Sequence, residues 1–378
     1  MSGFILATAL PSFVFTLIGG FVIRKLAPRF GLVDRPGHRK IHAAPIPLGG
    51  GLAIWAGLVL PLVVGLLVLR SVPLDQLTLF PPKHQIGTLL QIHAAGLHQQ
   101  SGDLIFLLSC ATVLMLLGLV DDRRGLDWRL RIVMQFAVAA VVVLWKGWKL
   151  TVFVDLPMLT NLISVLWIVG LINSFNMLDN MDGLSAGVAA IASAIFAAVL
   201  LVAPDPENQG PQFFVAGFLL VLVGSLVGFL WHNRPPARLF MGDSGSYLIG
   251  FLIAVTTMLA TFTGGNLPKH AILAPLCVLA VPLYDTISVV WIRLRSGRSP
   301  FEGDTNHFSH RLVDLGLSKT QAVLTIYLTT AACGLSALVL HQVNTAGAVT
   351  IVLSIVCLLA VIAILETTAR KKTRNLDK

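Results

Sequence analysis

Charged residues are scarce in this chain of 378 residues, and that scarcity excludes most classes of protein. Only 12% of the residues are Asp, Glu, Lys or Arg, about half of the roughly 25% found in soluble domains. So few charges cannot solvate a globule of this size, which excludes a soluble enzyme, a disordered protein and a disulfide-rich secreted domain. Hydrophobic residues make up 56% of the chain and its mean hydropathy is +0.83. The composition therefore predicts a polytopic membrane protein.

Cysteine is also scarce, and the placement of the cysteines argues against a thiol-based site. The chain has four cysteines, each inside an apolar run and none close in sequence to another: Cys110, Cys277, Cys333 and Cys357. No Cys-x-x-Cys or Cys/His spacing typical of a metal centre occurs. We interpret these residues as small hydrophobic side chains of the interior.

Long apolar runs dominate what remains. A helix needs roughly 20 apolar residues to cross the bilayer core, and on that scale the sequence predicts an all-α integral membrane protein with about eleven transmembrane helices. The expected limits are 3–23, 48–69, 104–120, 132–147, 161–178, 184–203, 213–231, 247–263, 271–292, 321–340 and 347–366.

The basic residues indicate the orientation of these helices. With eleven spans, 22 of the 27 Lys and Arg residues fall in loops on one side and 5 on the other. Because cytosolic loops are enriched in Lys and Arg, the N-terminus is predicted outside and the C-terminus in the cytosol. The net charge of +9 then reflects topology and contact with anionic lipids, and it does not indicate nucleic-acid binding.

One polytopic membrane domain, residues 1–378, is therefore expected. Its parts outside the membrane are predicted to be an extracytoplasmic loop at 70–103, a cytosolic catalytic loop at 293–320 and a basic cytosolic tail at 367–378.

Carboxylates gather where several predicted spans meet the cytosol. They come from four separate spans and comprise Asp121, Asp122, Asp179, Asp182, Asp243 and Asp285. Ionised groups at this depth are costly, so they are usually paired or functional. Convergence of such groups at one membrane face would suit a hard divalent cation held by oxygen ligands together with substrate phosphates.

Each motif has a plainer interpretation when it is taken alone. The Asp-Asp-Arg-Arg run could be charge pairing at a helix end, and Asp182 followed by glycine could be only a turn. The sequence GDSG at 242–245 matches the nucleophile signature of trypsin-like proteases, but it opens an apolar helix and lacks a Ser/His/Asp context.

The predicted cytosolic loop 293–320 is rich in residue types that bind phosphate. His307 and His310 are three residues apart, the spacing of one helical face. A zinc pair would need carboxylate or thiolate partners at zinc spacing, which are missing here. Contact of His307, His310 and Arg311 with a phosphate or diphosphate is favoured, because an arginine fork matches phosphate oxygens. The first cytosolic loop, which contains Lys40 and His42, is similarly basic and leads into a glycine-rich stretch.

Five sequence blocks together resemble a known family. In chain order they are DRPGHRKIHAAPIPLGG, GLVDD, NSFNMLDNMDGL, FMGDSGS and GDTNHFSHRL. This set is similar to the polyprenyl-phosphate N-acetylhexosamine-1-phosphate transferases of the undecaprenyl-phosphate GlcNAc-1-phosphate type. The wider family includes the phospho-N-acetylmuramoyl-pentapeptide transferase of peptidoglycan synthesis. The resemblance covers residues from about 20 to 340.

The resemblance implies a reaction, a cofactor and partners. The reaction is transfer of N-acetylhexosamine-1-phosphate, GlcNAc-1-phosphate first among the candidates, from a UDP-sugar to polyprenyl phosphate. UMP is released and cell-envelope polysaccharide assembly begins. The implied cofactor is Mg²⁺, with Mn²⁺ as a substitute. The implied location is the inner (plasma) membrane with the active site on the cytosolic face. Nucleic acid is not an expected partner, and a homodimer is left open.

The resemblance also assigns roles to individual residues. The implied catalytic residues are Asp121, Asp122, Asp182, His307 and His310, and the implied metal ligands are Asp243, Asp122 and Asp182. The implied substrate-binding residues are Asn176, Asp179, Arg311, Arg131, Asp285, Lys40 and His42.

Two departures from the family pattern and two alternatives remain. Ser309 stands where relatives often have a histidine, and Arg131 stands where a lysine is common. The alternatives are the pentapeptide transferase within the same family and, from a different class, a cation-coupled transporter. The sequence does not identify the hexosamine.

Overall fold

The protein is described here by a computed structural model that covers residues 1–34, 45–71, 100–150, 156–203, 211–260, 268–300 and 304–376. Most of these residues are helical. The α-helices are α1 (Ser2–Leu26), α2 (Gly50–Ser71), α4 (Ser101–Arg124), α5 (Trp128–Ala140), α6 (Pro157–Leu178), α7 (Leu184–Val202), α8 (Phe213–Asn233), α9 (Gly242–Leu259), α10 (Ala274–Val278), α11 (Ala280–Arg295), α12 (Phe308–Asp314), α13 (Lys319–Leu335) and α14 (Thr345–Leu376). The two strands are β1 (Val33–Asp34) and β2 (Ile46–Pro47).

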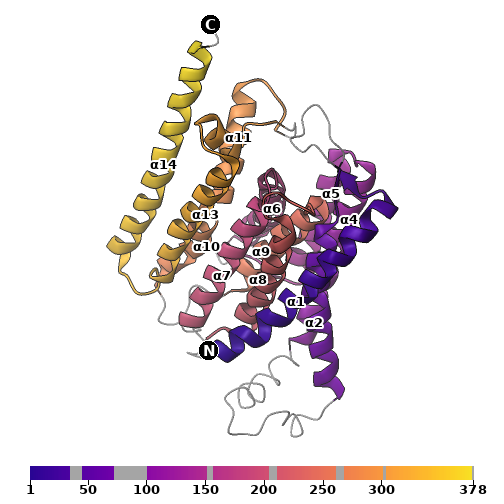
Figure 1. The fold of residues 1–378 in the computed structure, drawn as a ribbon. Helices are drawn as coiled ribbons and strands as arrows, with labels where there is room; N and C mark the ends of the chain where they lie inside the picture. Colours follow the sequence, from indigo (N-terminus) through magenta and orange to yellow (C-terminus); the bar gives the residue numbers. More distant parts are fainter. Residues whose placement is uncertain are drawn as a thin grey trace.

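The helices form a bundle with the two termini at opposite ends (Figure 1). Ten helices in the described part of the chain are long and apolar enough to cross a membrane, or eleven if the bent pair Lys269–Val278 and Ala280–Arg295 is one span. The prediction of an all-α polytopic membrane protein is confirmed. Termini at opposite ends agree with an odd number of crossings, while the side of the membrane on which each terminus lies stays a prediction.

The ninth predicted span, 271–292, is broken and does not form one straight helix. Its two parts meet at an angle of 66°. Pro282 lies in the first turn of α11 and has no N–H to donate to the carbonyl of Val278, four residues earlier in α10. The missing bond and the steric demand of the proline ring account for a break at this position.

Several helices extend beyond their predicted limits at the end of the bundle where the chain's C-terminus lies. Helix α9 begins at Gly242, whereas a start at 247 was predicted, and α4 continues to Arg124, beyond the predicted end at 120. Hydropathy finds the apolar part of a helix, but a helix can continue past it when the N–H groups of its first turn or the C=O groups of its last turn find partners. Helix α14 likewise runs on to Leu376, so residues 367–376 of the predicted tail are helical.

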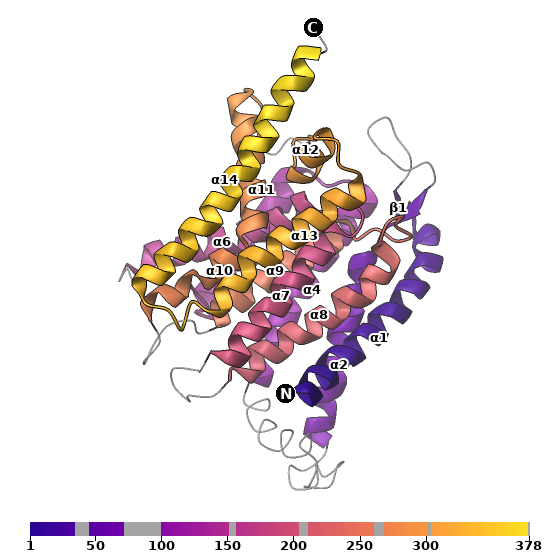
Figure 2. The same ribbon diagram turned by 60° about the vertical axis from the view of Figure 1, so that its left-hand side comes forward.

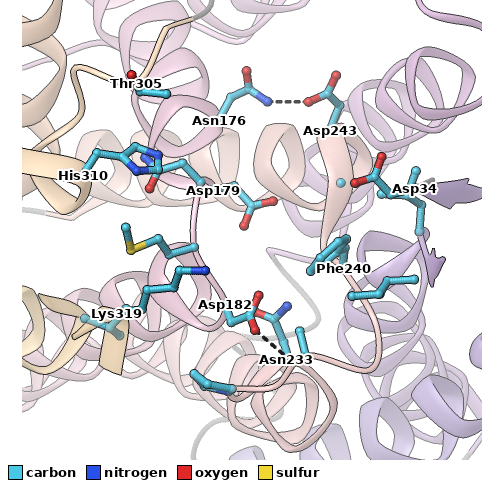
Figure 3. Close-up of a pocket in the computed structure, with 18 of the residues that line it drawn as sticks. Asp34, Asn176, Asp179, Asp182, Asn233, Phe240, Asp243, Thr305, His310 and Lys319 are labelled. Atoms are coloured by element: carbon cyan, nitrogen blue, oxygen red, sulfur yellow. Dashed lines mark hydrogen bonds between the residues drawn. The ribbon is translucent and has the colours of Figure 1, made fainter. Parts of the chain in front are cut away.

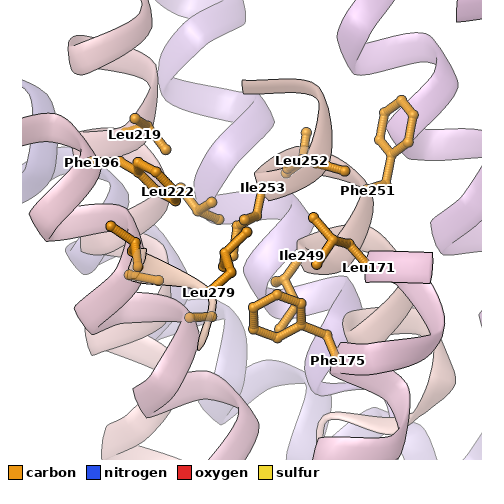
Figure 4. Packing of buried hydrophobic residues seen from close by; sticks show 14 of the residues in the cluster. Leu171, Phe175, Phe196, Leu219, Leu222, Ile249, Phe251, Leu252, Ile253 and Leu279 are labelled. Carbon is orange, nitrogen blue, oxygen red and sulfur yellow. The ribbon is translucent and has the colours of Figure 1, made fainter. Parts of the chain in front are cut away.

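The core lies around helices α7, α8 and α9, which have the largest buried share of the described spans. Figure 4 shows Phe175 of α6, Phe196 of α7, Leu222 of α8 and Ile253 of α9 packed together. Lipid tails are as apolar as these side chains, so close packing and not exclusion from water holds such a bundle together. Small residues permit that closeness: a Cβ at Gly51 would lie 2.2 Å from the backbone nitrogen of Gly245.

A small antiparallel hairpin, β1 with β2, lies at the same end of the bundle as α12 (Figure 2). The backbone N–H of Phe240 donates to Pro47 (2.9 Å), and that of Gly50 donates to the carbonyl of Phe240 (2.9 Å). These bonds join the hairpin and the start of α2 to the segment before α9. The hairpin thereby brings Asp34 to the mouth of a cavity.

Candidate active site

A cavity of about 1450 Å³ opens at the end of the bundle that carries the β1–β2 hairpin. Side chains from the hairpin, from α4, from the α6–α7 turn, from α9 and from the loop before α12 line it (Figure 3). The lining is acidic, because the carboxylates outnumber the cations among the described lining residues. The carboxylates are Asp34, Asp122, Asp179, Asp182, Asp243 and Asp304; the cations are Arg298 and Lys319. Of the six carboxylates predicted to converge, Asp122, Asp179, Asp182 and Asp243 line this cavity, whereas Asp121 and Asp285 do not.

Asp122 binds the N-terminus of α9 from the end of α4. Its carboxylate accepts the backbone N–H groups of Asp243 (2.7 Å) and Ser244 (3.2 Å). These donors belong to the first turn of α9 and have no partner inside that helix. A Cβ at Gly242 would lie 2.5 Å from an Asp122 carboxylate oxygen. The glycine thus allows the contact, and Asp122 sets where Asp243 lies.

Asp243 projects into the cavity from the start of α9. Asn176 of α6 donates its side-chain amide to Asp243 Oδ1 at 2.6 Å, and Arg131 of α5 lies 3.5 Å from Oδ2. The Asn176 amide also donates to Ser246 Oγ at 3.0 Å. Three helices therefore position this carboxylate, and its side chain remains 28% exposed. Asp243 has both the fixed orientation and the access that a ligand-binding carboxylate needs.

Asp121, its neighbour in the aspartate pair, is enclosed by partners and is not among the lining residues. Its Oδ2 accepts Arg131 Nη1 at 2.8 Å and the Tyr247 hydroxyl at 3.2 Å, and its Oδ1 accepts the backbone N–H of Leu126 at 2.6 Å. The side chain is 4% exposed. In this geometry Asp121 acts on the site through Arg131, so the two aspartates of the pair differ in environment.

Asp179 and Asp182 come from the turn between α6 and α7. The Asp182 carboxylate accepts the backbone N–H of Ala237 at 2.9 Å, and Gly183 continues the turn with φ of 77°. Burial, followed by the negative charges of Asp122 and Asp182, raises the pKa of Asp179 to about 7. The two neighbouring carboxylates add to the effect of burial, and a bound cation would offset their charge.

The two histidines of the loop before α13 have different positions. His310 lines the cavity, and burial, followed by the nearby His307 ring, holds the pKa of His310 below its usual range. His307 is 8% exposed and is not a lining residue; its Nδ1 lies 3.0 Å from Asp285 Oδ2. Asp285 also accepts the backbone N–H of Phe308 at 2.6 Å. The predicted role of Asp285 in substrate binding is not what this geometry indicates, since Asp285 orients His307 and the start of α12.

Arg311 also points away from the cavity. Its side chain is 7% exposed and is ion-paired with Glu366 of α14. The geometry therefore gives no support to the predicted contact between Arg311 and a diphosphate. Lys40 and His42 lie outside the described residues.

Several lining residues were missed by the sequence reasoning. Asp34, Asn180 and Asn306 lie inside three of the five family-like sequence blocks, and each is a polar residue close in sequence to a predicted site residue, which could have marked them as candidates. Lys319 lies seven residues after the block GDTNHFSHRL, and no sequence pattern marks it. Figure 3 shows its side chain reaching toward the space around Asp179 and Asp182.

The donor set suits a divalent cation that also binds substrate. Among the described residues, no three His, Cys, Asp or Glu side chains are close enough to hold a metal ion by themselves. Mg²⁺ in phosphoryl-transfer sites is commonly bound by one or two carboxylates, with substrate phosphates and water completing the octahedron. The carboxylates of Asp179, Asp182 and Asp243 fit that mode, because they face one cavity with excess negative charge.

Comparison with known proteins agrees with this geometry. The family model described as glycosyl transferase family 4 matches residues 104–261, which include the aspartate pair, the α6–α7 turn and the start of α9. The decaprenyl-phosphate N-acetylglucosaminephosphotransferase of Mycolicibacterium smegmatis is 33% identical over 333 residues, which are 81% of this chain and 74% of that protein.

Two further relatives cover more of this chain. The probable undecaprenyl-phosphate N-acetylglucosaminyl 1-phosphate transferase of Bacillus subtilis is 28% identical over 94% of this chain and 90% of its own length. The undecaprenyl-phosphate alpha-N-acetylglucosaminyl 1-phosphate transferase of Escherichia coli K12 is 29% identical over 84% of this chain and 79% of its own length. The chain therefore belongs to glycosyl transferase family 4 and is an enzyme of the sugar-1-phosphate transferase type.

Proposed function

We propose that the protein transfers GlcNAc-1-phosphate from UDP-GlcNAc to a polyprenyl phosphate, with release of UMP, at the cytosolic face of the plasma membrane. The observation that carries the proposal is the meeting of carboxylates from α4, the α6–α7 turn and α9 in one cavity at the end of a membrane-spanning bundle. The names of the relatives support the acceptor and the sugar.

In the proposed reaction the lipid phosphate is itself the nucleophile. One of its oxygens attacks the phosphorus that carries the sugar, and a new P–O–P bridge forms. The bond from that phosphorus to the bridging oxygen of the UDP diphosphate breaks, and the oxygen leaves with UMP. A phosphate monoester is largely dianionic at pH 7, since its second pKa is about 6, so removal of a proton from the nucleophile is helpful but not required.

The side chains of the cavity would supply positioning and charge. Bound Mg²⁺ would neutralise phosphate charge, and Asp243 with Asp179 or Asp182 would hold it. Asn176 and Arg131 keep Asp243 in one orientation. Arg298, Lys319 and His310, which line the cavity, would provide donors for anionic substrates. Phosphoryl transfer depends mainly on such positioning and electrostatic stabilisation, because the protein forms no covalent bond in the proposed step.

A product assay tests the proposal directly. Purified protein with polyprenyl phosphate and labelled UDP-GlcNAc should yield a labelled lipid diphosphate and an equal amount of UMP. UDP-GalNAc and UDP-MurNAc-pentapeptide, supplied in parallel, test the sugar. Use of the pentapeptide substrate alone would identify the other branch of the family, and solute uptake by proteoliposomes without UMP release would favour the transporter.

The proposed orientation has its own test. Ser296, after α11, and Gln342, before α14, are exposed at opposite ends of the bundle. In a variant whose exposed Cys357 is replaced by serine, Ser296→Cys should resist a membrane-impermeant thiol reagent in intact cells, whereas Gln342→Cys should react. The reverse pattern would contradict a cytosolic active site.

A further inference from the structure

Helix α14 is the least buried of the described spans, but it carries one deeply buried carboxylate. Only 6% of its apolar window is buried inside the protein, whereas the Glu366 side chain is 5% exposed. Arg311 Nε donates to Glu366 Oε2 at 2.9 Å, and the Tyr284 hydroxyl donates to the same oxygen at 3.0 Å. A charge placed in a membrane-spanning helix is costly unless it is paired. The contact is therefore a specific attachment of α14 to α12.

The Arg311 guanidinium also binds the backbone at Asn306, the residue before His307. Arg311 Nη1 donates to the backbone carbonyl of Asn306, and Nη2 donates to Ser288 Oγ of α11 at 2.9 Å. Arg311 thus connects three segments: the loop at Asn306, helix α11 and, through Glu366, helix α14. Because Asn306 and His310 line the cavity, this connection lies directly behind the wall of the site.

Aromatic packing and a second carboxylate hold the start of α12 in the same place. The Arg311 guanidinium lies 5.8 Å from the centre of the Tyr284 ring, and that ring meets Phe308 edge to face at 5.5 Å. Phe308 is fully buried, and its N–H donates to Asp285. Helix α12 has only seven residues, too few to be stable without such tertiary contacts. Its orientation therefore depends on the groups that surround Arg311.

We propose that Glu366 is a positioning residue for the transferase: it fixes the Arg311 guanidinium, which in turn sets the backbone at Asn306 and the direction in which His310 faces the cavity. The last helix would then be part of the catalytic apparatus through this one side chain. The proposal rests on the proposed function for its kinetic consequences, but the placement of α12 is measurable without any reaction.

The kinetic test compares four variants with the wild-type enzyme in detergent. Glu366→Gln keeps the shape of the side chain and removes its charge, and Glu366→Ala, Arg311→Ala and their double variant complete a cycle. We expect kcat to fall by about tenfold to a hundredfold in each, by analogy with the loss of partners that orient metal ligands, with a smaller change in KM. The double variant should be no worse than Arg311→Ala, because both changes disrupt one connection. Asp314→Asn, which removes an exposed carboxylate from α12, is the matched control and should keep wild-type turnover.

The structural test uses hydrogen exchange of backbone amides at 304–314. Glu366→Gln should speed exchange there, and Asp314→Asn should not. Turnover of Glu366→Gln within twofold of wild type, additive effects in the cycle, or unchanged exchange would each overturn the proposal. If the wild-type protein transfers no sugar phosphate, the proposed function fails, while the exchange comparison still decides whether Glu366 positions α12.

Discussion

Two groups of charged side chains lie at the same end of the bundle and differ in their balance of charge. The cavity group faces open space with six carboxylates and two cations among the described residues. The group behind α12 is closed, and its Arg311 and Glu366 are paired with each other at 2.9 Å. Excess charge of one sign around an open space favours binding of a ligand of opposite sign, whereas a closed and paired group holds elements together. The comparison thus separates ligand binding from positioning.

The histidine motif contributes to both groups. His310 belongs to the cavity group, whereas Arg311, the next residue, belongs to the group behind α12. Consecutive residues of a helix are about 100° apart around its axis, so one short helix presents them to different surroundings. Residues of one motif can therefore have different tasks.

Removal of divalent cations is expected to have the largest effect on the cavity group. Without a cation, the carboxylates would repel both anionic substrates. Chelation with EDTA should reduce UMP release to the background of the assay, and Mg²⁺ or Mn²⁺ should restore it, since both accept oxygen ligands. Full turnover after exhaustive chelation would contradict a metal-dependent cavity.

Asp243→Asn should have the next largest effect. The amide keeps the size of the side chain and can still accept the hydrogen bond from Asn176, but it lacks the charge needed to bind a cation. We expect kcat/KM to fall by more than about a hundredfold, which corresponds to roughly 3 kcal/mol. The matched control is Asp127→Asn: Asp127 is exposed and caps α5 by accepting the N–H of Arg129, and asparagine caps a helix equally well. Equal activities of the two variants would remove Asp243 from the proposed cation site.

Asp285→Asn tests the connection between the two groups. Asparagine can still accept the N–H of Phe308 with its oxygen, but its NH₂ group then faces His307 Nδ1, so the charged acceptor is lost and the ring can keep the contact only as the tautomer with Nδ1 unprotonated. A charge-assisted hydrogen bond is worth about 1.5–3 kcal/mol, so we expect a loss of kcat of about tenfold or more. Steady-state kinetics beside Asp314→Asn would check this. Wild-type kcat in the Asp285 variant would mean that the orientation of His307 is unimportant.

The smallest effect on activity is expected at Ser309, between the two histidines. Ser309 is 1% exposed and donates to Asn180 Oδ1, so Ser309→Ala should lower the free energy of unfolding by about 0.5–1.5 kcal/mol. The larger side chain of Ser309→His must displace its neighbours, at a cost of about 1–3 kcal/mol. Thermal unfolding in detergent measures both. A more stable histidine variant would show that the space around Ser309 adapts to the residue common in relatives.

The sequence was a reliable guide to the helices and to the residue types of the site, and less reliable for the role of each residue. Apolar runs predicted eleven spans, and the described residues hold ten such helices and one bent pair in their places, because a span needs a minimum length of apolar residues. The bend itself was not predicted. The apolar runs misplaced the start of α9, since the acceptor for its N–H groups is Asp122, more than a hundred residues earlier. No local pattern reports such a partner.

Composition, run length and the order of motifs determined that this protein is a helical membrane protein of glycosyl transferase family 4, because these features depend on residues near one another in the sequence. Only the tertiary structure decided that Asp122 and Asp243 face the cavity while Asp121 is enclosed by partners, that Asp285 holds His307, and that Arg311 pairs with Glu366. Each of these outcomes depends on which distant helix supplies the opposing charge or hydrogen-bond partner. That choice is made by the packing of the bundle as a whole.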